Sequence, residues 1–127
     1  MKRLFVLGLL FSVSVVFASG SCLSGKTSGE TISARIVGLF VRNADDSTQT
    51  KHRVKIDNQD CTLTNGSGDV TLGSATKSSG YLEFGENADA LLAFLINAYN
   101  RDQVISFRLW NVSGDGYNQI KFAHFAD

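Results

Sequence analysis

Residues 87–111 constrain the fold most tightly, because they read as one helix, a short turn and one strand. Asn87 is a residue type that caps helices, and Asp89 in the first turn complements the helix dipole. Apolar residues then cover an arc of roughly 200°, about twice what an ordinary surface helix buries. The sequence therefore predicts a helix over residues 87–100 that is buried on two sides. Either the polar segment 57–80 or a neighbouring subunit would cover the second side.

The strand predicted next, over residues 103–112, alternates cleanly between two faces. Ile105, Phe107 and Leu109 share one face, which we expect to point into the core. Trp110, the chain's single tryptophan, falls on the other face and is expected to lie outside, at the mouth of a loop. The alternative is that Trp110 closes the end of a barrel or packs under residues 57–80.

Further strands are predicted over residues 31–42, 50–56, 70–72, 81–84 and 119–125, with a turn at 43–49. Gly38 marks a bend or bulge in the first strand. Alternation places Phe40 and Phe122 on inward faces, and apolar residues on both faces suggest that the second half of the first strand is covered on both sides. The predicted fold is mainly β with one helix: an OB-fold-like barrel of five or six strands, with the helix after the third strand. A helix on an open antiparallel sheet is the alternative.

The first 18 residues have the pattern of a secretory signal peptide. Lys2 and Arg3 precede an uncharged apolar run, which ends in small residues at Ala18. The apolar run is too short for a transmembrane anchor. We therefore expect cleavage after Ala18, a single domain over residues 19–127, and a secreted or periplasmic location.

The chain has two cysteines, Cys22 and Cys61. In an oxidising compartment the default expectation is one disulfide between them, closing a loop of about 39 residues and stabilising the fold by roughly 3–4 kcal/mol. Two free thiols are an alternative, and so is a lipid on Cys22. Two cysteines without a histidine at ligand spacing predict no metal site, and we expect no cofactor.

Charge argues against a nucleic-acid partner. Without Lys2 and Arg3, 10 basic residues face 12 acidic ones, a net charge of about −2. An OB-type nucleic-acid binder would also need several aromatic residues on one face. Lys51, Arg53 and Lys55 form an outward basic row, which we interpret as a solvated face or edge protection; a sulfate or phosphate contact is the alternative.

The sequence contains no recognisable catalytic apparatus. His52 and His124 lie on separate predicted strands with no acid or cysteine at readable spacing, and the common catalytic motifs are absent. We interpret both histidines as barrel-lining or surface residues, and we do not expect an enzyme.

What remains is an exposed aromatic residue beside polar loop residues. A flat indole offers an apolar face to a sugar ring, while amide and carboxylate groups bind its hydroxyls. The candidate glycan-binding residues at the last predicted hairpin are Trp110, Asn111, Asp115, Tyr117 and Asn118.

The end of the chain resembles the B subunits of cholera and heat-labile enterotoxins, which belong to the AB5 toxins. The resemblance covers about the last 40 residues: Ala98-Tyr99, a charged turn, Val104, then Leu109-Trp110-Asn111, a loop and a closing strand. It implies a homopentameric OB-fold subunit that binds cell-surface glycan and joins an A subunit, and it implies that a terminal sugar stacks on Trp110.

The chain also departs from the enterotoxin pattern. Val112 and Ser113 stand where the family has a sugar-binding asparagine and lysine, and Arg108 stands where it has its second cysteine. The resemblance therefore implies the fold and a general class of ligand, without the family's ganglioside preference.

Overall fold

The computed structural model describes residues 21–42, 51–85 and 88–126. The predicted signal peptide, the turn at 43–49 and the capping Asn87 lie outside these ranges. The strands are β1 (Ser28–Gly29), β2 (Thr31–Phe40), β3 (Lys51–Thr64), β4 (Val70–Thr71), β5 (Tyr81–Gly85), β6 (Val104–Val112) and β7 (Asn118–Phe125), and the helices are α1 (Ser74–Ser79) and α2 (Asp89–Asn100). The expectation of a mainly β protein is confirmed, but the described residues contain two helices where one was predicted.

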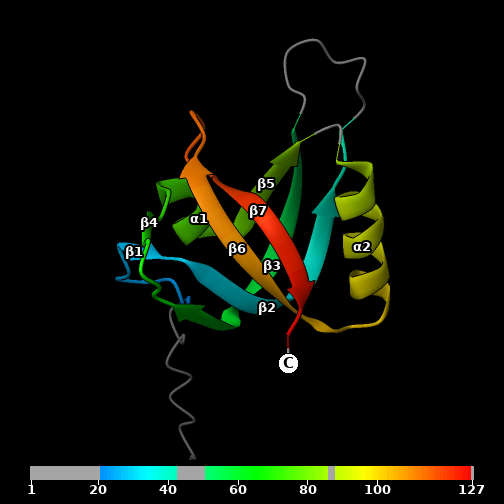
Figure 1. Ribbon diagram of the computed structural model, residues 1–127, viewed down its shortest axis with the longest axis horizontal. Helices are drawn as coiled ribbons and strands as arrows, with labels where there is room; N and C mark the ends of the chain where they lie inside the picture. Colours follow the sequence, from blue (N-terminus) through cyan, green and yellow to red (C-terminus); the bar gives the residue numbers. More distant parts are fainter. Residues whose placement is uncertain (1–20, 43–50, 86–87, 127) are drawn as a thin grey trace, which may run out of the picture.

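Five strands form a ring-like sheet in the order β2-β3-β5-β7-β6, with β6 returning to β2 (Figure 1). The pairings are antiparallel except for β5 with β7, which run parallel at Glu83 and Gln119. Helix α2 follows the third strand of the ring, as predicted. Strands β1 and β4 form a separate two-stranded sheet.

The core lies inside the ring, where alternate residues of each strand meet. The fully buried apolar side chains include Leu23, Ile32, Val54, Ile56, Leu82, Leu95, Ile105 and Phe107. Ile105, Phe107 and Leu109 of β6 point inward as the alternation predicts. Their burial is the main favourable term that holds the ring closed.

Two β-bulges reverse the predicted direction of aromatic residues. In β2 the register shifts between Ile36 and Gly38, near the predicted bulge at Gly38, so that Phe40 is exposed instead of buried. In β7, Ile120 opposes Leu109 while Phe122 opposes Arg108, which turns Phe122 outward. The inward predictions for Phe40 and Phe122 are therefore wrong, because one extra residue in a strand flips every later side chain.

The polar segment 57–80 is more ordered than its composition suggests. Strand β3 continues to Thr64, well beyond the predicted end at residue 56, and α1 occupies Ser74–Ser79. Gly80 ends α1 in the left-handed conformation that glycine adopts without strain. In Figure 1, α1 and β4 lie on the side of the ring away from α2. The alternative in which this segment covers α2 is therefore wrong.

Helix α2 packs against β2 and β7 through one face only. Leu95 and Ala98 are buried, whereas Ile96 and Tyr99 are 40% and 44% exposed. Val37 of β2 is also exposed, so the second half of that strand is not covered on both sides as predicted. The described chain therefore leaves an apolar surface open on α2 and the adjoining end of β2.

The disulfide between Cys22 and Cys61 is present, with the Cα atoms 5.8 Å apart. It joins the segment before β1 to the second half of β3, and Leu23 beside it is fully buried. The predicted pairing is thus confirmed. Among the described residues, neither helix has the length and apolar character needed to cross a bilayer.

Candidate functional site

Trp110 lies near the end of β6 and points away from the ring. Its neighbour in the chain, Leu109, is buried, and Trp110 is 51% exposed. Asn111, the next residue, is also exposed. The indole therefore stands on a strand of the ring instead of on a free loop, so its backbone is already ordered.

The turn after β6 is fixed by its own backbone and by α1. The N–H of Ser113 donates to the carbonyl of Tyr117 at 2.8 Å, and Gly116 has φ +87°, a left-handed conformation. The N–H groups of Ala75 and Thr76 both donate to the carbonyl of Gly116, at 3.1 and 3.3 Å. Two backbone amides in the first turn of α1, which have no partner within the helix, thus hydrogen-bond to the hairpin and tie the two elements together.

Asn118, the first residue of β7, holds the hairpin from within. Its Oδ1 accepts from the N–H of Gly73 at 2.9 Å, and its Nδ2 donates to the carbonyls of Thr71 and Trp110 at 2.9 and 3.1 Å. Asn118 is fully buried. It has no surface to offer a ligand, and its carboxamide instead fixes the backbone of Trp110. We therefore exclude Asn118 from the binding site.

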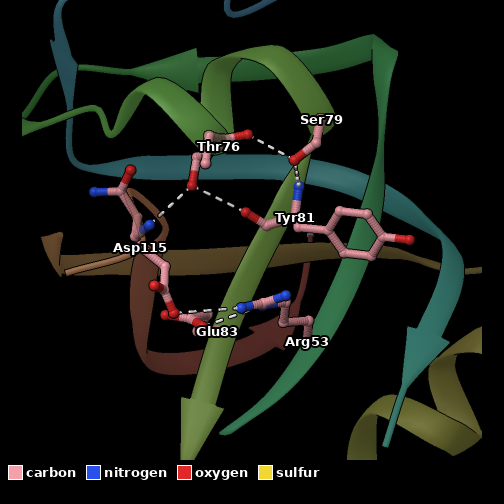
Figure 2. Close-up of polar contacts among 8 residues, drawn as sticks. Arg53, Thr76, Ser79, Tyr81, Glu83 and Asp115 are labelled. Carbon is pink, nitrogen blue, oxygen red and sulfur yellow. Dashed lines mark hydrogen bonds and ion pairs between the residues drawn. The ribbon is translucent and has the colours of Figure 1, made fainter. Parts of the chain in front are cut away.

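The backbone of Asn118 extends this network toward β5 (Figure 2). Its N–H donates to Oγ1 of the buried Thr76 at 2.8 Å, and that hydroxyl donates to the carbonyl of Tyr81 at 2.9 Å. Ser79 Oγ accepts from the N–H of Tyr81 at 3.3 Å. Helix α1 is thus bonded to two strands of the ring through side chains from a segment that looked disordered by composition.

Asp115 and Tyr117 both contact Arg53, which lies on β3 opposite Glu83 of β5; Figure 2 shows Arg53 with Asp115 and Glu83. Arg53 Nη2 is 3.6 Å from Asp115 Oδ2, and the Arg53 guanidinium stacks over the Tyr117 ring at 4.2 Å. Arg53 Nε also donates to Oε2 of the buried Glu83 at 3.1 Å, while Glu83 Oε1 has no hydrogen-bond partner among the described residues. Arg53 is largely buried, so the interpretation of the whole basic row as a solvated face is wrong for this residue.

The structure thus divides the five predicted site residues into three groups. Trp110 and Asn111 are exposed side by side on β6. Asp115 remains exposed and Tyr117 is half-buried, and both are engaged by Arg53. Asn118 is fully buried and forms the third group. No alternation or motif signals the contact to Arg53 or to Glu83, because these residues lie far away in the sequence.

Phe122 is an exposed aromatic residue that the sequence patterns missed. It is outward on β7, directly opposite Arg108, and Trp110 is two residues further along β6. The bulge in β7 therefore adds a second aromatic side chain to the outer surface that carries Trp110. The Phe122 ring stacks on His124, with ring centroids 6.4 Å apart.

The histidines occupy unconnected positions. His52 is buried beside Phe84, and its Nδ1 accepts from the backbone N–H of Arg42 at 2.9 Å. His124 is exposed on β7. Within the described ranges, no three histidine, cysteine, aspartate or glutamate residues gather as a metal site. What the arrangement offers chemically is an exposed flat aromatic face, from Trp110, next in the chain to the exposed amide of Asn111.

Comparison with protein-family models, with curated proteins and with solved structures finds no match to this chain.

Proposed function

We propose that this protein is a secreted, carbohydrate-binding subunit with an OB-type barrel, similar to the B subunit of a bacterial toxin. Three features of the ring support the fold. The fifth strand lies between the third and the fourth, the third and fifth strands run parallel, and α2 connects the third to the fourth. OB folds bind oligosaccharides and oligonucleotides, and the charge balance disfavours the second.

The observation that carries the ligand proposal is the exposure of Trp110 on a fixed strand. A tryptophan side chain half open to water loses the hydrophobic stabilisation of a buried one, so its position is better explained by a partner than by packing. The apolar face of a pyranose fits a flat indole. Asn111 beside it provides an amide that both donates to and accepts from sugar hydroxyls.

The open apolar surface supports the oligomer proposed with this function. Ile96 and Tyr99 are exposed on α2, and Val37 and Phe40 are exposed on β2, one of the strands against which α2 packs. We propose that a second copy of the chain covers this surface, in a pentamer if the enterotoxin resemblance extends to assembly. An A subunit would then be a further partner.

The disulfide supports export. A bond between Cys22 and Cys61 persists in the periplasm or outside the cell, whereas the cytosol keeps thiols reduced. This agrees with the signal peptide predicted for residues 1–18.

A glycan array comparing the wild-type mature protein with Trp110→Ala tests the ligand proposal. We expect wild-type signal on a restricted set of glycans and its loss in the variant. Asp60→Ala is the control, because Asp60 is exposed on β3 and belongs neither to the Trp110 site nor to the apolar surface proposed for assembly, so this variant should keep the signal. Thermal unfolding must show that Trp110→Ala remains folded. An array without wild-type signal, or signal retained in Trp110→Ala, would contradict the proposal.

The exposed apolar surface also favours a second candidate function, a small structural or protein-binding domain with no toxin partner. Light scattering separates the two functions. A pentamer that Ile96→Glu converts to monomer would support the subunit, since a charge there cannot be buried in an interface without a large cost. A wild-type monomer without array signal would support the protein-binding domain.

A further inference from the structure

A concave surface lies at the opposite end of β6 from Trp110. It is an open cavity of about 640 Å³, lined by Arg35, Arg101, Asp102, Gln103, Val104, Phe125 and Ala126. Figure 1 shows the turn from α2 into β6 running beside the last strand here. Its volume falls within the range of small-molecule sites.

The walls of the cavity are held in place by packing and by backbone pairing. The Phe125 ring lies 4.8 Å from the ring of Phe94 on α2, and the Arg101 guanidinium lies 5.9 Å over its centre. The N–H of Ala126 donates to the carbonyl of Val104 at 3.0 Å, which fixes the end of the chain to β6. Phe125 therefore presents an aromatic surface that does not need to be ordered by a ligand.

Asp102 adopts a left-handed backbone conformation, which aspartate and asparagine tolerate better than most other non-glycine residues. Among the described residues it is the non-glycine residue with positive φ, at +48°. It stands just after α2, where the N–H of Gln103 donates back to Ala98, a position usually held by glycine or asparagine. Here the carboxylate of Asp102 lies 3.6 Å from Arg35 Nε, inside the cavity.

The charges on the walls favour an anion. The described lining residues carry two guanidinium groups and one carboxylate. The Arg35–Asp102 contact is longer than a hydrogen bond and largely exposed, so it is weak and replaceable. Asp127, the next residue in the chain, lies outside the described residues. Arginine binds carboxylates with two parallel hydrogen bonds, and this distinguishes the cavity from the Trp110 site, where the proposed contacts are an indole and the Asn111 carboxamide.

We propose that this cavity is a second ligand site, which binds a sugar acid: a pyranose that carries a carboxylate. Arg35 and Arg101 bind the carboxylate, the ring lies against Phe125, and its hydroxyls hydrogen-bond to the side chains of Asp102 and Gln103. This inference extends the proposed carbohydrate binding and rests on it for the class of ligand, but it uses none of the residues around Trp110.

Titrations of the ¹⁵N-labelled mature protein by NMR test this site with matched probes. D-glucuronate and D-glucose differ at the carboxylate, acetate has the carboxylate without the ring, and N-acetylneuraminate is a second sugar acid. We expect saturable shifts of the Gln103, Val104 and Ala126 amides with at least one sugar acid. The same amides should barely respond to glucose or acetate, and the Trp110 indole N–H should stay unchanged.

Arg35→Gln and Arg101→Gln should each weaken binding of the responding sugar acid about tenfold, the loss expected for one charge-assisted contact. Lys121→Gln is the control, because it removes one positive charge from an exposed position on β7 outside the cavity lining. Equal responses to acetate and sugar acids would overturn the proposal, as would binding unchanged in both arginine variants or no response to either sugar acid. Failure of the glycan array at Trp110 would leave the cavity shifts intact, so the two proposals fail separately.

Discussion

Replacing Asn118 with alanine should destabilise the protein strongly without removing any surface that a ligand could touch. The carboxamide makes three hydrogen bonds at 2.9, 2.9 and 3.1 Å to backbone groups of Gly73, Thr71 and Trp110. Each contributes about 1 kcal/mol net, and the buried partners left unpaired add to the loss. We expect the free energy of unfolding to fall by about 3–4 kcal/mol, a large part of the stability of a small domain.

Urea denaturation followed by far-UV circular dichroism and by emission measures this loss. At an m-value of roughly 1.5–2 kcal/mol/M, the midpoint should fall by about 2 M. Trp110 is the single tryptophan, so its emission reports on the hairpin directly. Asn111→Ala is the matched control, because it removes an exposed carboxamide and should change stability by no more than about 0.5 kcal/mol. A midpoint for Asn118→Ala within about 0.5 M of wild type would refute the structural role of this residue.

Two further variants test the disulfide and the fit of the hairpin, and one tests the core. Replacing both Cys22 and Cys61 with alanine should lower the free energy of unfolding by about 3–4 kcal/mol, as measured by urea denaturation, and an unchanged midpoint would contradict the role given to the bond. Gly73→Ala should lower the free energy of unfolding by about 2 kcal/mol or more, because the added Cβ would lie 2.1 Å from the carbonyl oxygen of Gly116 in the hairpin. Gly114→Ala is the control: its added Cβ meets nothing within 4 Å, so thermal unfolding should be unchanged. Leu95→Ala should lower the free energy of unfolding, measured by calorimetry, by about 2–5 kcal/mol, because Leu95 is fully buried. A decrease below about 1 kcal/mol would mean that α2 is not part of the core.

The regular parts of the fold were predictable from hydrophobic period. Alternation in β6 correctly predicts the burial of Phe107 and Leu109 and the exposure of Trp110. The pairing of β6 with β2 runs without a register shift from Val104 to Arg108. The same argument fails for Phe40 and Phe122. Each lies beyond a bulge, and a bulge depends on the partner strand, which the local pattern does not reveal.

Helix α1 and the far half of β3 were missed for a different reason. Serine, threonine and glycine have weak intrinsic preferences, so composition suggested an irregular segment. Thr76 and Asn118 order this segment through hydrogen bonds across more than 40 positions of the chain. Tertiary contacts of this length outweigh local propensity and leave no periodic signal.

The candidate site was predictable only where exposure follows from alternation. Trp110 and Asn111 lie where the pattern indicates. Asp115 and Tyr117 were expected to be free, but Arg53 engages both from β3. A polar residue type does not distinguish a ligand contact from a buried structural partner, since both need the same hydrogen-bonding groups.

The central claim is that Trp110 binds a sugar, and its emission tests that claim most directly. A glycan identified on the array would be titrated into the mature protein with excitation selective for tryptophan. We predict a saturable change in the intensity and wavelength of the emission, with a midpoint equal to the dissociation constant measured by calorimetry. Calorimetric binding of that glycan with no change in Trp110 emission would contradict the claim.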